Sequence, residues 1–210
     1  MNHKVFYLLI MSSIFCSNIC YSQKEPIKYT IDNVGYIFVS PELELQSGDY
    51  KEYTESYPQV GKGWVIFQQK GLNEYSPSAM GHFVRIMVYT IMGNKGDFLK
   101  VNADMDVSVS DLDNLNSTLK RQCIQENESM GIEVLLWYGV SVERINNQNC
   151  VKYSCLTKYG TNPPVEAAYY MFQNDDRVHL VSISCRKKDK DIWWPILMKS
   201  LNSFKITNIR

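Results

Sequence analysis

The sequence CVKYSCLTKYGTNPPVEAAYYMFQNDDRVHLVSISCR, residues 150–186, contains three runs of strand-forming residues separated by two turn signals. The runs cover residues 150–157, 165–173 and 178–186 and are rich in β-branched and aromatic side chains. Residues 158–164, with one Gly and two Pro, separate the first two runs, and residues 174–177, Asn-Asp-Asp-Arg, separate the last two. This pattern predicts two consecutive hairpins and therefore an antiparallel sheet.

A helix is predicted upstream of this stretch, over residues 111–130. Its apolar side chains recur at three- and four-residue spacing and form one stripe: Leu112, Leu115, Leu119 and Cys123. Ser110 begins a pattern that resembles a capping box, and Gly131 suits the end of a helix. We expect Leu115 and Leu119 to be buried against the sheet.

A long strand is predicted directly after this helix, over residues 132–144. Its apolar side chains alternate with other residues, which places them on one face of the strand: Ile132, Val134, Leu136, Tyr138, Val140 and Val142. The alternation is typical of a strand with one face against a core.

The N-terminal half contributes further strands. Residues 27–31 and 36–39 flank a turn signal, and residues 64–69 form a third short run. Residues 82–92 are apolar on both faces, so we expect this strand inside the sheet. Residues 49–57 carry tyrosines at helical spacing and fit either a short helix or an extended loop.

A second helix is predicted near the C-terminus from the spacing of four large apolar residues: Trp194, Leu197, Leu201 and Phe204. Asp191 could cap this helix, and Pro195 is expected in its first turn. Together the elements predict a single α+β domain over residues 23–210, an antiparallel β-sheet flanked by helices in an α/β/α sandwich.

The first 22 residues have the anatomy of a secretory signal peptide. Lys4 supplies a basic start, and an apolar run of about a dozen residues follows, shorter than the roughly 20 needed to span a bilayer. We expect cleavage after Ser22, a periplasmic or secreted product and no membrane span after cleavage. The alternatives are lipidation at Cys20, whose preceding Ile19 is larger than that signal prefers, and a retained anchor helix.

Bulk composition excludes several classes of protein. The chain has 22 basic and 22 acidic residues and no basic stripe, which argues against a nucleic-acid partner. Its hydrophobic content of 45% argues against a disordered chain.

Four cysteines follow the predicted cleavage site: Cys123, Cys150, Cys155 and Cys185. No C-x-x-C spacing occurs, so redox and zinc motifs are not supported, and small apolar core residues are favoured over disulfides. In the predicted strand order Cys155 and Cys185 lie two strands apart, beyond disulfide reach. Only Cys123, from the helix above the sheet, could meet one of them.

The order of features resembles the PsbP-like fold group, which includes PsbP subunits, Ran-binding Mog proteins and DcrB-like envelope proteins. The segments that carry the resemblance are GYIFVSP at residues 35–41, the hairpin tip at 174–176, His179, Trp194 and Ser203-Phe204. The stretch FQQKGLN at residues 67–73 is similar to one in exported Bacteroidetes proteins. The resemblance implies an antiparallel sheet flanked by helices and a non-catalytic binding or assembly role, with no shared active site.

Motifs for catalysis or metal binding do not stand out in the sequence. His82 and His179 have no second ligand at i+2 or i+4, and no Gly-x-Ser-x-Gly or glycine-rich phosphate loop occurs. Asp175 and Asp176 could hold a hard cation, but such pairs at a hairpin tip usually form the turn. We therefore assign no catalytic residue, metal or cofactor.

Two features suggest a binding surface. Arg85 interrupts an apolar strand, so it must pair with a carboxylate such as Glu143, face solvent, or line a groove for an anionic group. An aromatic set could form an interaction surface or simply cover the sheet: Tyr50, Tyr53, Tyr57, Trp137 and Tyr170.

These observations predict an exported, non-enzymatic envelope binding or accessory protein. Its partner would be another protein or a lipid-like ligand, in a role such as immunity or assembly. The alternative is a hydrolase with an unconventional active site, which requires a polar cluster in a cleft that the sequence does not display.

Overall fold

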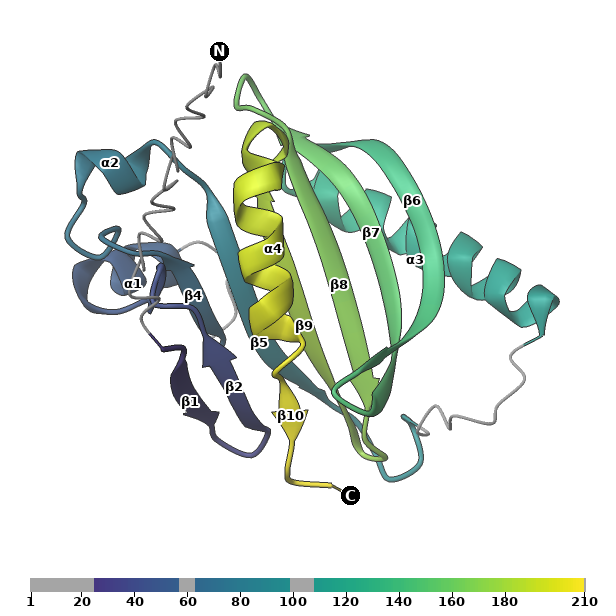
Figure 1. Cartoon of the computed structure of the whole chain (residues 1–210). Helices are drawn as coiled ribbons and strands as arrows, with labels where there is room; N and C mark the ends of the chain where they lie inside the picture. Colours follow the sequence, from purple (N-terminus) through teal and green to yellow (C-terminus); the bar gives the residue numbers. More distant parts are fainter. Residues whose placement is uncertain (1–24, 57–62, 99–107, 210) are drawn as a thin grey trace, which may run out of the picture.

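The computed structural model describes residues 25–56, 63–98 and 108–209 (Figure 1). Most of the strands form one seven-stranded antiparallel sheet, and their bounds are β3 Leu43–Leu45, β4 Val65–Gln69, β5 Val84–Met92, β6 Ile132–Ile145, β7 Gln148–Tyr159, β8 Val165–Gln173 and β9 Arg177–Arg186. The spatial order is β3-β4-β5-β9-β8-β7-β6. A three-stranded sheet, β1-β2-β10, joins β1 Ile27–Ile31, β2 Gly35–Val39 and β10 Lys205–Ile206.

The described residues form four α-helices: α1 Gly48–Glu55, α2 Pro77–Met80, α3 Val109–Ser129 and α4 Lys190–Leu201. α4 and the small sheet cover one face, and α3 lies behind the other face in the view of Figure 1. The main core fills the layer between α4, the small sheet and the large sheet, where Ile37, Ile183 and Leu197 are fully buried. The predicted α+β architecture, an antiparallel sheet flanked by helices, is confirmed.

The two hairpins at residues 150–186 form as the turn signals indicate. β8 has its predicted bounds, and β9 is buried along almost its whole length between β5 and β8. The 174–176 tip turns where Asp175 adopts a positive φ of 64°, a conformation that Asp tolerates better than most residues. The predicted strand at 82–92 begins at Val84 and is internal in the sheet, as expected.

Helix α3 is confirmed, but its cap and its burial differ from expectation. Ser108 caps the helix, because its Oγ accepts a hydrogen bond from the Asp111 backbone N at 3.1 Å; Ser110 does not. Leu115 and Leu119 are half-buried, and only Cys123 and Asn127 on this helix are buried. α3 packs mainly over β6, the edge strand of the sheet, which is why the leucines remain partly accessible.

Strand β6 contradicts the single apolar face predicted for residues 132–144. Its pairing with β7 shifts register between Val134 and Leu136 and again between Trp137 and Gly139. Each extra residue rotates the strand, so Leu136 and Tyr138 are both 49% exposed, whereas Trp137 packs with the cluster beneath α3. Gly139 takes a φ of +98°, which a residue with a side chain rarely adopts.

Two further details of the sequence prediction need correction. α4 begins at Lys190, so Pro195 lies beyond the first turn, and the N-cap position is Asp189 rather than Asp191.

Strand β3 and helix α2 are too short to show a periodicity in the sequence. Residues 49–55 are helical, one of the two alternatives, within α1.

Candidate functional site

The residues predicted as a binding surface do not come together in the structure. Tyr170 is 1% exposed in the main core, so it is excluded from any surface. Trp137 lies half-buried under α3, where its Nε1 donates a hydrogen bond to Asn116 Oδ1 at 2.8 Å. Tyr53 on α1 is 55% exposed. Tyr57 lies outside the described residues.

Arg85 and Tyr50 do meet, although not as an anion site. Arg85 Nη2 donates to the Tyr50 hydroxyl at 3.2 Å, and its Nη1 donates to Gln69 Oε1 at 3.0 Å. Burial lowers the pKa of the Arg85 guanidinium, and Tyr50 partly opposes this shift. Glu143, the example given of a possible carboxylate partner for Arg85, instead binds Lys152 Nζ at 2.7 Å. Arg85 therefore anchors α1 to the sheet.

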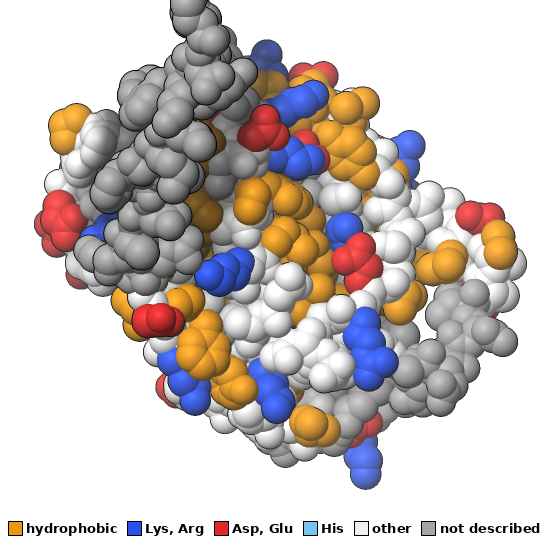
Figure 2. Space-filling view, viewed as in Figure 1, with side chains coloured by type: hydrophobic (Ala, Val, Ile, Leu, Met, Phe, Trp, Pro, Cys, Tyr) orange, Lys and Arg blue, Asp and Glu red, His pale blue; other side chains and the backbone are white. Residues whose placement is uncertain are grey.

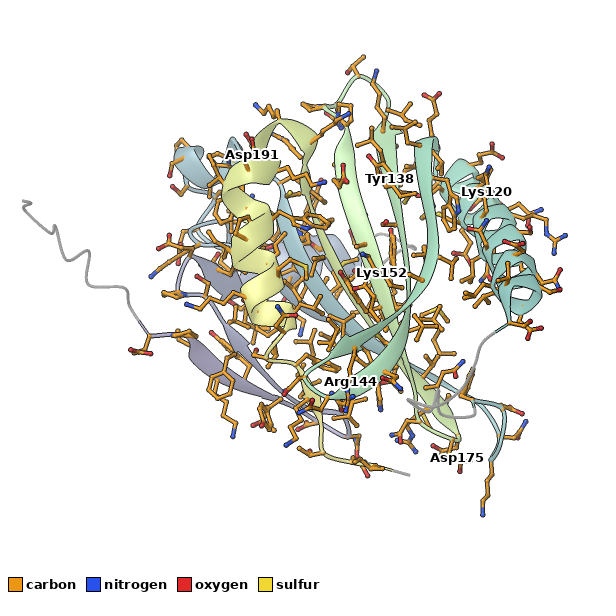
Figure 3. All side chains as sticks on the ribbon, turned by 45° about the vertical axis from the view of Figure 1, so that its right-hand side comes forward. Lys120, Tyr138, Arg144, Lys152, Asp175 and Asp191 are labelled. Carbon is orange, nitrogen blue, oxygen red and sulfur yellow. The ribbon has the colours of Figure 1, made fainter. Side chains whose placement is uncertain are left out.

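The α4 side of the large sheet carries charges that neutralise one another. Besides the Lys152–Glu143 pair, Lys190 Nζ lies 2.8 Å from Glu166 Oε1, and Tyr138 donates to the same carboxylate at 3.2 Å. Figure 2 shows apolar side chains interspersed with acidic and basic ones beside α4, and Figure 3 labels Lys152 and Tyr138 on the strands there. The charges of Lys152 and Lys190 are therefore neutralised within the protein.

A cleft of about 540 Å³ lies on the opposite face, between the C-terminal half of α3 and the sheet. It is on the side turned away from the viewer in Figure 1, while Lys120 in Figure 3 marks the outer side of α3. Six aromatic side chains line it: Trp64, Phe83, Tyr89, Tyr153, Tyr159 and Tyr169. The sequence prediction named none of these six.

Small side chains at the centre of the sheet create the cleft. Strand register places Tyr153, Tyr169, Ser182 and Met87 in one row across β7, β8, β9 and β5. This row contains one small residue, Ser182, and the next row contains two, Ala167 and Ser184. Because these side chains are short, they leave a hollow between the longer side chains around them. α3 does not fill it, because α3 packs mainly over β6. Small residues at alternate positions of β8 and β9 are the sequence signal that could have indicated this site.

Stacked aromatic rings stiffen the walls of the cleft. The Trp64 and Tyr89 rings stack with centroids 4.3 Å apart and planes 8° apart. The Tyr153 and Tyr169 rings stack at 4.6 Å and 11°. Burial raises the pKa of both Tyr153 and Tyr169, so these phenols are neutral at physiological pH.

Besides the tyrosines, seven polar side chains line the cleft: Glu126, Asn127, Thr157, Asn162, Ser182, Ser184 and Arg186. Ser182 is 2% exposed, and its Oγ has no hydrogen-bond partner among the described residues. Arg186 lines the cleft at the end of β9, half-buried, and donates to the backbone oxygen of Gly81. No carboxylate of the described residues forms an ion pair with Arg186. Glu126 and Asn127 contribute polar side chains from α3.

His179, Cys150 and Cys185, which the sequence analysis considered for catalysis or metal binding, lie outside this cleft. His179 lies on the α4 side, hydrogen-bonded to Thr90 and near Asn174, and burial lowers its pKa to about 4. Burial raises the pKa of the Cys150 and Cys185 thiols to about 12 and about 11. Across residues 25–56, 63–98 and 108–209, no group of three His, Cys, Asp or Glu could hold a metal ion.

Comparisons with known proteins address the fold. No protein-family model and no curated protein matches the sequence. The solution structure of cyanobacterial PsbP (CyanoP) from Synechocystis sp. PCC 6803 aligns with a TM-score of 0.51 and 8% identity, over 87% of this chain and 92% of that one. A crystal structure from Bacteroides thetaiotaomicron aligns with a TM-score of 0.45 and 9% identity, over 88% of this chain and 48% of that one. The antiparallel sheet, its flanking helices and the alignment with CyanoP together show that this chain has a PsbP-like fold.

Proposed function

We propose that this protein is an exported, non-enzymatic binding protein that holds a lipid-like molecule in the cleft between α3 and the large sheet. The cleft itself is the observation that carries the proposal. Its volume of about 540 Å³ lies within the range of ligand pockets, and its walls are largely apolar and aromatic with several polar groups. The PsbP-like fold is compatible with an accessory role. Within the described ranges no helix is long and apolar enough to cross a bilayer.

Arg186 favours a ligand with one anionic end. Arg186 offers a guanidinium without an acidic partner among the described residues, and a carboxylate is its natural complement. At about 30 Å³ per water-sized group, the cleft holds a chain of roughly 18 groups. A single-chain fatty acid of about that length fits both the volume and the charge, with its carboxylate near Arg186.

Fluorescence titration with the fatty acid cis-parinaric acid, followed by displacement with palmitate, tests this proposal. Met87→Trp fills the cleft and should weaken binding at least about tenfold, equivalent to about 1.4 kcal/mol. Met92→Trp is the matched control, because Met92 is 60% exposed at the other end of the same strand and does not line the cleft. Equal affinity in the two variants, or no saturable binding to the wild type, would refute the site.

The head-group assignment has its own test. Arg186→Gln should weaken palmitate binding and leave hexadecanol, the uncharged analogue, unaffected. If the two ligands lose affinity equally, Arg186 only shapes the cleft. The non-enzymatic part is tested with p-nitrophenyl esters of several chain lengths. Turnover abolished by a single polar substitution in the cleft would support the hydrolase alternative instead.

A further inference from the structure

Two cysteines from different layers of the fold meet beside the cleft. Cys123 lies on α3 and Cys155 on β7, 32 positions apart in sequence, with their Sγ atoms 4.0 Å apart. Both side chains are buried, in one cluster with Ala167. Cys123 also lines the cleft, so a small oxidant entering there can reach its sulfur.

The surroundings hold the Cys123 side chain in place. Asn127 Nδ2 donates to the Cys123 backbone oxygen at 2.7 Å and lies 3.4 Å from its Sγ. The remaining apolar stripe of α3 is only half-buried, so the helix can shift slightly. The shift must bring the two sulfur atoms from their present separation to the S–S bond length of about 2 Å. Few other buried side chains fasten α3 to the sheet.

We propose that Cys123 and Cys155 are oxidised to an intramolecular disulfide that fastens α3 to β7 as one wall of the cleft. The oxidant is a small-molecule disulfide, such as oxidised glutathione. The Cys123 thiolate attacks the oxidant's disulfide, forms a mixed disulfide and releases one thiolate. Deprotonated Cys155 then attacks the Cys123 sulfur and releases the second. The protein loses two protons and two electrons, and one disulfide of the oxidant is reduced to two thiols.

The local chemistry sets this order of attack. The Sγ atoms of Cys123 and Cys155 form a hydrogen-bonded contact at 4.0 Å, which lowers the pKa of Cys123 and raises that of Cys155. Because Cys123 is also the member of the pair that lines the cleft, it is the first nucleophile. The other two cysteines of the described residues, Cys150 and Cys185, do not compete. Cys150 and Cys185 belong to the main core on the other side of the sheet, on β7 and β9, with β8 between them. That separation, roughly 9–10 Å, exceeds disulfide reach.

Non-reducing peptide mapping of the full mature chain tests the proposal, after equilibration in a buffer of reduced and oxidised glutathione. We expect one cross-linked peptide pair, joining Cys123 and Cys155. In the wild type, oxidation should raise Tm by about 5–15 °C, because the bond closes a loop of about 32 residues. Cys123→Ser should abolish both the cross-link and the shift, whereas Cys150→Ser, the matched buried control, should keep both.

The outcomes separate this proposal from the proposed function. Mapping requires no lipid, so a Cys123–Cys155 bond in a protein that fails to bind palmitate supports the disulfide alone. A folded, oxidised wild type in which both thiols remain alkylatable overturns the proposal. A bond that includes Cys150 or Cys185 overturns it as well. If Cys123→Ser fails to fold, Cys155→Ala and the mapping of the wild type still decide the question.

Discussion

Lowering the pH should destabilise this protein through one buried histidine. His179 on β9 is 0% exposed, and its Nδ1 lies 2.8 Å from Thr90 Oγ1. Asn174 Nδ2 lies 3.4 Å from the other ring nitrogen and donates to the Asn208 backbone oxygen. The neutral imidazole ring can accept a hydrogen bond from this amide at its second nitrogen. The protonated ring cannot, because both of its nitrogens are donors, so the amide disfavours protonation. Burial, followed by the charge of Arg177, lowers the pKa of His179 to about 4 from the ordinary 6.5.

The sign and size of the effect follow from linkage. Because the folded pKa is depressed, the unfolded chain binds the proton first as the pH falls below about 6.5. The stability is therefore fully present above that pH and is lost progressively down to about pH 4. The full loss is about 3 kcal/mol, and about 2 kcal/mol of it should have disappeared by pH 5.

Urea unfolding at pH 7 and pH 5 measures this effect. His179→Gln keeps a polar group next to Thr90 and removes the titrating ring. Between pH 7 and pH 5, the unfolding free energy of this variant should therefore fall by about 2 kcal/mol less than that of the wild type. His82→Gln is the control, because His82 lies at the surface beside Asp189 and should leave the difference in place. If wild type and His179→Gln lose the same stability between the two pH values, the reasoning about His179 is wrong.

The remaining predictions concern α3, α1 and the N-terminus. Leu115→Ala should cost about 1–2 kcal/mol in urea unfolding, below the 2–5 typical of a fully buried leucine, and a larger loss would contradict its half-burial. Tyr53→Ser should leave Tm unchanged, because the ring is exposed, whereas Tyr50→Ser should lower it by removing the contact with Arg85; pull-down with each variant shows whether α1 also binds a partner. N-terminal sequencing of the exported product should begin after Ser22, and an intact Met1 in that product would exclude the predicted cleavage.

Local sequence was sufficient for most of the fold. Strands β7 to β9 follow from short-range alternation and from turn residues such as Asp175, whose preferences operate within a few positions of the chain. α3 follows from its apolar stripe in the same way. Strand β6 marks the limit of this reasoning, since its two bulges depend on pairing with β7, and alternation within one strand carries no information about its partner's register.

The candidate site could not be predicted in this way, because it depends on contacts between distant residues. The sequence by itself determined the longer strands, the turns between them, the long helix and the antiparallel character of the sheet, since these depend on neighbours along the chain. Only the tertiary structure decided that Arg85 binds Tyr50 rather than Glu143, that Cys123 meets Cys155, and that a cleft opens over Ser182. Each of these depends on register across several strands and on where α3 lies above the sheet, which no window of local sequence specifies.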